Sequence, residues 1–285
     1  MKGILNLISQ WHGSIKIIQH KLTHTMKERI IGIMGAMPEE INGIVHLLEG
    51  KQERTLGMRT YYSGTVNGIK TVVVFSRWGK VAAAATVTSL ILEFKITELI
   101  FTGVAGATNT QLSTGDIVIA KRLIQHDMDA RPLMKQFEIP LLDKIHFDCP
   151  ALQLNIATNA VNELLEKNHL HAIIDSIQLG KFGITTPRLF TGDIASGDKF
   201  FSAVLEKEKL IASLPAVLCV EMEGAAVAQV CFEYDIPFTI IRTISDAADE
   251  NSVNDFPLFI ETIAGRYTVA IIKNIYDLVL NKPEN

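Results

Sequence analysis

Apolar and polar residues are arranged along this chain in short runs that alternate with stretches of helical periodicity. The first run covers residues 30–34, and apolar residues then recur at positions 41, 44, 45 and 48, the spacing of one helical face. Pro38 suits a first helical turn, because its missing N–H removes no hydrogen bond there, and Gly50 is expected to close the helix. The pattern predicts a strand, a tight turn and a helix that carries Glu39 and Glu40 in its first turn.

The same alternation continues to the last helix. Apolar runs predict strands at residues 61–66, 69–75, 99–102, 116–120, 173–177, 189–192, 217–220 and 238–242. Longer periodic stretches predict helices at residues 81–94, 151–166, 224–234 and 256–280. Asn67-Gly68 favours a type I′ hairpin between the first two of these strands. Residues 125–148 are the least patterned and are expected to loop over the surface.

Strands that alternate with helices predict an α/β fold of three layers, a mixed central sheet flanked by helices. No linker, internal repeat or low-complexity segment interrupts residues 26–285. We therefore expect a single α/β domain over residues 26–285.

Residues 1–25 have a pattern of their own. Ile4, Leu7, Trp11 and Ile18 fall on one helical stripe, with lysines off it. Polar residues interrupt the apolar stretch that a secretory signal would need. This N-terminal extension is predicted to be an amphipathic surface helix or a disordered segment, and it is dispensable if translation begins at Met26.

The composition narrows the choice of partners. A formal net charge of −4 over 285 residues gives no basic field for polyphosphate, so neither nucleic acid nor an anionic membrane is an expected partner. No apolar run is long enough to predict a membrane span. Cys149, Cys219 and Cys231 form neither a CxxC pair nor a zinc pattern. We expect reduced core thiols in a cytoplasmic protein that binds a small neutral or cationic molecule.

Acidic residues follow several predicted strands at the point where each strand ends. Glu40 follows the first, Glu221 and Glu223 follow the run at 217–220, and Asp246 follows the run at 238–242. Ligands of open α/β sheets bind beyond the carboxyl ends of the strands. Apolar surroundings also raise the pKa of a carboxyl group toward neutrality. With no phosphate loop, metal triad or cofactor fingerprint in the sequence, these acids indicate acid/base hydrolysis through a cationic intermediate.

Six segments of the chain together resemble one enzyme family. They are Gly35-Ala36-Met37-Pro38-Glu39-Glu40, Gly79-Lys80-Val81-Ala82-Ala83-Ala84, residues 102–106, Ser196-Gly197-Asp198, Val220-Glu221-Met222-Glu223 and Arg242-Thr243-Ile244-Ser245-Asp246. In order and spacing they closely resemble the 5′-methylthioadenosine/S-adenosylhomocysteine nucleosidases, from about Met26 to the last helix. The resemblance implies the nucleoside phosphorylase fold, a homodimer, and cleavage of adenine from thio-ribosides without cofactor or metal.

The resemblance assigns the chemistry to three carboxylates. Asp246 would protonate the purine ring, Glu40 would deprotonate the attacking water, and Glu223 would hold the ribose hydroxyls. Adenine is a poor leaving group and must be protonated as it departs, while the ribose becomes an oxocarbenium ion that carboxylates stabilise. Two acids on opposite faces of a sugar, with room for one water, are the arrangement of inverting glycosidases.

By the same resemblance, other positions surround the substrate or support those that do. Met222 would pack under the sugar, Ser245 would orient Asp246, and Phe256 would close over the adenine. Glu221 would border the substrate, and together with Arg242 behind it would mainly hold the other contact residues in place. The remaining expected contacts are Phe200 and Phe201 beside the base, and Val104, Ala105 and Gly106 along the cleft.

Three positions depart from the commonest family pattern. Val104 stands where serine is frequent, and Trp78 stands where a small aliphatic residue is frequent. Leu133 occupies the place of a partner-subunit aromatic residue that touches the thioalkyl tail. Trp78 and Leu133 are expected substrate contacts, and the choice among methylthioadenosine, S-adenosylhomocysteine and 5′-deoxyadenosine stays open.

Rival functions share parts of this pattern. A phosphorylase of the same fold would hold phosphate with cations, but Thr102 and the acids Glu39 and Glu40 stand where such relatives carry arginine; Arg77 alone favours it. A non-catalytic nucleoside sensor would not need both acids. A hydrolase of another 5′-modified adenosine, such as aminofutalosine, would share the adenine end.

One further motif invites a metal-binding interpretation. His126-Asp127-Met128-Asp129 resembles the HD motif of metal-dependent enzymes. That class needs further His and Asp ligands on an all-helical frame, whereas this segment follows a predicted strand. A structural or interface role is therefore predicted for it.

Overall fold

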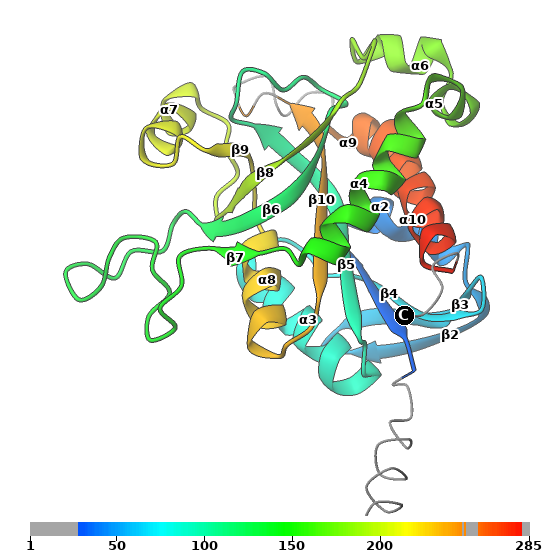
Figure 1. Ribbon diagram of the computed structural model, residues 1–285, viewed down its shortest axis with the longest axis horizontal. Helices are drawn as coiled ribbons and strands as arrows, with labels where there is room; N and C mark the ends of the chain where they lie inside the picture. Colours follow the sequence, from blue (N-terminus) through cyan, green and yellow to red (C-terminus); the bar gives the residue numbers. More distant parts are fainter. Residues whose placement is uncertain (1–27, 247, 249–255, 281–285) are drawn as a thin grey trace, which may run out of the picture.

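The computed structural model describes residues 28–246, 248 and 256–280, apart from the side chains of residues 167, 168, 256 and 257 (Figure 1). The predicted N-terminal extension, residues 1–25, lies outside this part of the chain. The described strands are β1 (Ile30–Gly35), β2 (Glu49–Leu56), β3 (Arg59–Val66), β4 (Ile69–Phe75), β5 (Glu98–Ala107), β6 (Ile117–Gln125), β7 (Phe147–Asp148), β8 (Leu189–Ser196), β9 (Val217–Glu221) and β10 (Phe238–Asp246). The described helices are α2 (Pro38–Val45), α3 (Lys80–Phe94), α4 (Ala151–Leu165), α5 (Lys167–Ile173), α6 (Ser176–Lys181), α7 (Val204–Ser213), α8 (Gly224–Glu233), α9 (Phe256–Phe259) and α10 (Gly265–Leu280), with a π-helical turn η1 (Ile260–Ala264) between the last two.

One mixed sheet joins the ten described strands in the order β10-β6-β8-β9-β5-β1-β4-β3-β2, with β7 paired to β6. Because β5 also pairs with β10, the strands β5, β10, β6, β8 and β9 close into a ring, from which the other strands extend. β1 is parallel to β5, and β5 is parallel to β10. The carboxyl ends of these three strands therefore lie at one edge of the sheet.

Helices cover both faces of the sheet, and the predicted three-layer α/β fold is confirmed. Helices α2, α4 and α10 pack together on one side, and α3 packs with α8 on the other (Figure 1). Adjacent residues of β1 belong to different layers of the core: Ile33 is in the apolar cluster that includes Ile271 of α10, whereas Met34 is in the cluster that includes Val87 of α3. Among the described helices, none is long and apolar enough to cross a bilayer.

Several local predictions are confirmed. Asn67 and Gly68 have φ angles of 49° and 80°, as the type I′ hairpin between β3 and β4 requires. β5 and β10 extend further than predicted, so that Gly106 pairs directly with Asp246. This pairing brings a residue without a side chain opposite a candidate catalytic acid.

Other local predictions were wrong. The predicted strand at 173–177 is instead the end of α5 and the start of α6. Gly50 does not close the first helix, which ends at Val45; it lies in β2 with a φ of 62°. β2 itself was missed because its charged residues are exposed and show no apolar alternation. Pairing with β3 at the sheet edge forms this strand, and that pairing is not visible in its own sequence.

Candidate active site

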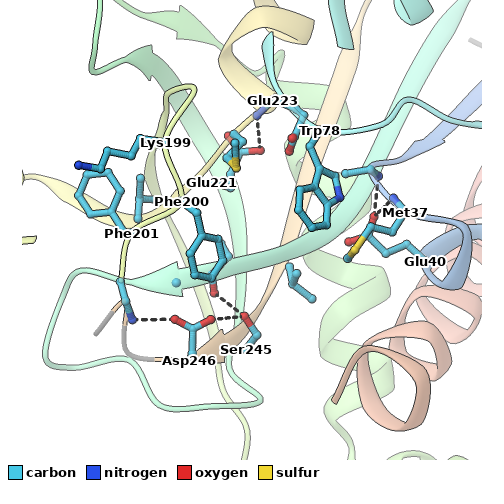
Figure 2. Close-up of a pocket in the computed structure, with 17 residues that line it drawn as sticks. Met37, Glu40, Trp78, Lys199, Phe200, Phe201, Glu221, Glu223, Ser245 and Asp246 are labelled. Carbon is cyan, nitrogen blue, oxygen red and sulfur yellow. Dashed lines mark hydrogen bonds between the residues drawn. The ribbon is translucent and has the colours of Figure 1, made fainter. Parts of the chain in front are cut away.

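A cavity of about 630 Å³, counting its open mouth, lies at the edge where β1, β5 and β10 end (Figure 2). The segments that follow β4, β8 and β9 complete its wall. The residues that line it are Ala36, Met37, Glu40, Trp78, Val104, Ala105, Gly106, Lys199, Phe200, Phe201, Val220, Glu221, Met222, Glu223, Ser245, Asp246 and Ala248. The fold thus brings Glu40 and Asp246, from opposite ends of the chain, into one cavity.

Glu40 lies in the first turn of α2 and is almost fully buried. Its Oε2 accepts the backbone N–H of Ala36 at 2.5 Å and that of Met37 at 3.0 Å, so the turn after β1 curls around the carboxyl group. β5 passes close behind: a Cβ on Gly103 would lie 2.9 Å from Oε1 of Glu40. Only glycine leaves room for the carboxyl group at that point.

The environment of Glu40 prepares it for proton transfer. Burial raises the pKa of Glu40 to about 7, against the opposing influence of the Arg242 charge and of backbone N–H groups. A carboxyl group that titrates near neutrality is matched to acid/base work at that pH.

Asp246 ends β10 and is held at both oxygens. The Ser245 hydroxyl donates to Oδ2 at 2.6 Å, and the Ala248 N–H donates to Oδ1 at 2.7 Å (Figure 2). Across the strand pair, a Cβ on Gly106 would lie 3.0 Å from Oδ1. Neighbours in sequence and a glycine on β5 therefore fix the direction in which this carboxyl group points.

Glu221 lines the cavity, but its carboxylate is engaged by the protein. It accepts from Arg242 at 2.8 Å, from the N–H of Gly224 at 2.9 Å, from that of Glu223 at 3.1 Å, and from the Ser196 hydroxyl. Arg242 is buried behind it and does not line the cavity. The pair is positioned to hold the start of α8 and the segment after β9.

Glu223 is the third buried acid of the cavity. The Gly79 N–H donates to its Oε1 at 2.7 Å, which ties the turn before α3 to the segment after β9. Burial, together with the nearby Glu221 charge, raises the pKa of Glu223 to about 8. A neutral ligand therefore meets a site where two carboxyl groups, Glu40 and Glu223, ionise reluctantly.

This raised pKa makes stability depend on pH. Because the folded state favours protonated Glu223, this group stabilises the folded state fully below pH 4.5, its ordinary pKa. That stabilisation is lost as the pH rises through about 8. Glu223→Gln removes the titration; its free energy of unfolding is expected to exceed that of the parent by about 2 kcal/mol at pH 9 and to approach it at pH 5. Urea denaturation at both pH values measures this, with exposed Glu93→Gln as control. A difference independent of pH would contradict the assignment.

Aromatic and sulfur-containing side chains form much of the remaining wall. Phe201 is buried and meets the ring of His126 edge-on, with 5.3 Å between centroids. Phe200 and Trp78 also line the cavity, although 42% and 62% of their surfaces are exposed. Met222 lies between the two acids of the β9 exit. Flat apolar surfaces of this kind suit a planar heterocycle such as a purine.

Leu133, a sequence-predicted contact, does not line the cavity of its own chain. Leu133 is 89% exposed in the loop between β6 and β7, which extends away from the sheet in Figure 1. Phe256 begins α9, and its side chain lies outside the described part of the structure. Residues that sequence reasoning missed are Ala36, Met37, Lys199, Val220 and Ala248. Each lies within a few positions of a predicted site residue in the sequence, and this proximity is the signal that could have identified it.

The His126-Asp127 motif lies beside the cavity and holds its rim together. Asp127 accepts the Lys80 ammonium at 2.5 Å and the Asp198 N–H at 2.9 Å. Asp198 in turn accepts the Lys80 N–H at 2.8 Å. The motif thus connects the segment after β6 with the start of α3 and the segment after β8.

Comparison with known proteins places this site in a family. The sequence matches the phosphorylase superfamily over residues 30–275. The chain belongs to the phosphorylase superfamily. This superfamily member is 32% identical over 237 residues to the 5′-methylthioadenosine/S-adenosylhomocysteine nucleosidase of Staphylococcus aureus, over 82% of this chain and 94% of that protein.

Solved structures agree with the sequence comparison. The superfamily member matches S-adenosylhomocysteine nucleosidase from Streptococcus pyogenes, in complex with 5-methylthiotubericidin, with a TM-score of 0.77 and 30% identity over 90% of this chain and 99% of that one. It matches the futalosine hydrolase of Helicobacter pylori with a TM-score of 0.75 and 33% identity over 88% of this chain and 98% of that one. The resemblance to the nucleosidases is confirmed, and the enzyme class is that of the superfamily's N-glycosidases.

Proposed function

We propose that this protein hydrolyses the N-glycosidic bond of 5′-methylthioadenosine, of S-adenosylhomocysteine, or of both, releasing adenine and the thio-ribose. The observation that carries the proposal is the placement of Glu40 and Asp246 in one cavity, which Glu223 and aromatic side chains also line. The nucleosidase relatives, which share the fold over most of this chain, support the same substrate class.

In this proposal Asp246 is the general acid. Adenine departs easily only when its ring is protonated, and the Ser245 and Ala248 hydrogen bonds hold the carboxyl group in one orientation toward the base. Phe200 and Phe201 lie on the same side of the cavity (Figure 2). They would pack beside the purine while the proton is transferred.

Glu40 is the proposed general base. As the C1′–N bond lengthens, positive charge develops on the ribose, and a water molecule attacks the face opposite the departing adenine. Ionised Glu40 takes a proton from that water, and its pKa of about 7 suits the task. Glu223, anchored by Gly79 through one oxygen, would hold the ribose hydroxyls by hydrogen bonds.

The charges around the cavity favour water over phosphate as the nucleophile. Among the described lining residues Lys199 alone is basic, and it is paired with Glu206. Arg242 is paired with Glu221, and Arg77 does not line the cavity; its guanidinium donates to the Met58 carbonyl. Phosphate would therefore meet the buried acids without a free guanidinium to neutralise it.

Phosphate dependence is therefore a sharp test of the reaction type. Purified protein is expected to release adenine from 5′-methylthioadenosine at the same rate with and without phosphate at roughly 10 mM. The reason is that no unpaired basic side chain among the described lining residues is available to bind phosphate. Chromatography of the products measures this. Formation of a ribose 1-phosphate would instead establish a phosphorylase, and binding without adenine release would establish a sensor.

A second candidate substrate class is favoured by one specific observation. The futalosine hydrolase of Helicobacter pylori is as similar to this chain as the nucleosidases are. A nucleoside with another 5′ substituent would use the same acid, base and ribose contacts. Adenine release from a panel of 5′-modified adenosines, including aminofutalosine, separates the two classes.

We extend the proposal to a cytoplasmic homodimer, as the family resemblance implies. Exposed Leu133 would then contribute to the 5′ end of the partner's cavity. Sedimentation of the purified protein tests the dimer directly.

A further inference from the structure

The strand that carries the proposed general acid leaves its regular pairing just before that residue. In β10, Ile244 pairs with Ala105 of β5, but the register between the two strands shifts between Ile244 and Asp246. A shift of this kind bends a strand and changes the direction of the side chains beyond it. The direction of the Asp246 carboxyl group therefore depends on how firmly Ile244 is held.

Ile244 is held on its other side by the turn that precedes β6. Its N–H donates to the Asp116 carbonyl at 2.8 Å, and its own carbonyl accepts from the Gly115 N–H at 2.8 Å. These two bonds continue the antiparallel pairing of β10 with β6 toward Asp246. The backbone of Gly115 and Asp116 thus fixes the last regularly paired residue before the acid.

The side chain of Asp116 keeps this turn in place. It is buried but does not line the cavity. Its Oδ2 accepts from the Ser113 N–H and from the Arg188 guanidinium, both at 2.9 Å, and its Oδ1 accepts from the Arg188 N–H at 2.8 Å. The same guanidinium also donates to the Gln111 carbonyl. One buried carboxylate therefore joins the turn before β6 to the residue that precedes β8.

We infer that Asp116 is a positioning residue for the general acid, which holds the end of β10 so that the Asp246 carboxyl group reaches the purine ring. This inference rests on the proposed function for the role of Asp246. Because Asp116 lies outside the cavity lining, it acts through the backbone bonds to Ile244. A displaced acid slows proton transfer, whereas the ribose contacts at Glu223 stay intact, so the effect falls on kcat and not on KM.

The kinetic test replaces Asp116 by asparagine. The amide presents an NH2 group where one carboxylate oxygen accepts, so part of the buried donor set loses its acceptor. Asp116→Asn is expected to lower kcat for adenine release about tenfold with little change in KM, since a displacement of about 1 Å can cost up to about a hundredfold. A parental kcat, or a loss that falls on KM, overturns the inference.

A second buried ion pair, between β6 and β8, supplies the matched control. Asp193 of β8 is buried and accepts from Nε and Nη2 of Arg122 at 2.9 and 2.6 Å, but neither residue lines the cavity. Asp193→Asn makes the same chemical change and is expected to keep the parental kcat. Equal losses of kcat in the two variants would assign Asp116 to general stability and overturn the inference.

Arg188→Gln is a milder variant that acts on the same contact. The Arg188 side chain is half exposed, and the substitution keeps the backbone N–H that donates to Asp116. It is expected to lower kcat about threefold, less than Asp116→Asn does, because two of the three donors remain. If Asp116→Asn does not fold, this variant decides the question, and a parental kcat in Arg188→Gln overturns the inference.

A binding measurement separates this inference from the proposed reaction. 5′-Methylthio-9-deazaadenosine has a C–C glycosidic bond and an N–H at ring position 7, whereas the 7-deaza isomer has carbon there, so neither is cleaved by protonation at that position. Asp246 can accept a hydrogen bond only from the first, which the parent protein is expected to bind more tightly. Asp116→Asn, or Arg188→Gln in its place, is expected to reduce this preference about fivefold, part of one hydrogen bond to a charged group.

The two measurements together distinguish the possible failures. If the parent protein does not cleave 5′-methylthioadenosine but the variant shows the reduced binding preference, the hydrolysis proposal fails and the inference stands. An equal preference in the parent and the variant overturns the inference, whether or not the parent is a hydrolase.

Discussion

Asp246→Asn is expected to lower kcat for adenine release by about a thousandfold, within the range for loss of a general acid. An asparagine keeps the size of the side chain, and its one oxygen can still accept from the Ala248 N–H while its NH2 group donates to the Ser245 hydroxyl, the two groups that hold the carboxyl group in place. It has no proton to give to the purine, so the loss falls on the chemical step and not on the cavity's shape. The dissociation constant of 5′-methylthioadenosine is expected to change by less than about threefold, a fraction of a hydrogen bond.

Single-turnover kinetics and calorimetry on the same preparation separate these two effects. Asp277→Asn is a matched control, because that aspartate is exposed on α10 and contacts Asn67 far from the cavity. Near-parental turnover in Asp246→Asn would remove this residue from the role of acid. A loss of binding comparable to the loss of rate would assign it to recognition instead.

Glu40→Gln is expected to have the second large effect on the rate of adenine release, and it is also expected to change how kcat/KM depends on pH. The parental kcat/KM is expected to rise with pH up to about 7, because the base must be ionised and burial raises the pKa of Glu40 to about 7. Below that pH the rate falls about tenfold per unit. Glu40→Gln still accepts from Ala36 and Met37 but takes no proton, so a loss of about a hundredfold or more is expected, with that acidic limb gone.

Rates from pH 5 to 9 on both proteins measure this signature. Glu39→Gln is the matched control, since Glu39 is the preceding residue of α2 and is exposed. A Glu40→Gln variant that keeps the parental profile would show that another group activates the water.

Much of the site is predictable from the sequence because ligands of open α/β sheets bind beyond the carboxyl ends of the strands. Glu40 and Asp246 are separated by most of the chain, yet each follows a strand of the same parallel set, so one geometric rule brings them to one edge. The rule cannot distinguish the roles of Glu221 and Glu223. That distinction depends on the buried Arg242 and on the Gly79 N–H, which are tertiary contacts.

Local pattern predicts the apolar elements well and the polar ones poorly. β2 is formed by pairing with β3 and exposes its charges, so its sequence lacks the alternation that marks a half-buried strand. Residues 173–177 lie across the end of one short helix and the start of another, because an apolar run of that length fits either a strand or a helix. Lining residues such as Met37 and Lys199 enter the cavity through the path of the backbone, which no local pattern specifies.

A crystal structure of Asp246→Asn with 5′-methylthioadenosine bound tests most directly whether Glu40 and residue 246 lie on either side of one glycosidic bond. The purine is expected against the substituted residue, the ribose hydroxyls against Glu223, and a water molecule between Glu40 and the anomeric carbon. A nucleoside bound with its base toward Glu40, or outside the cavity, would contradict the proposed mechanism.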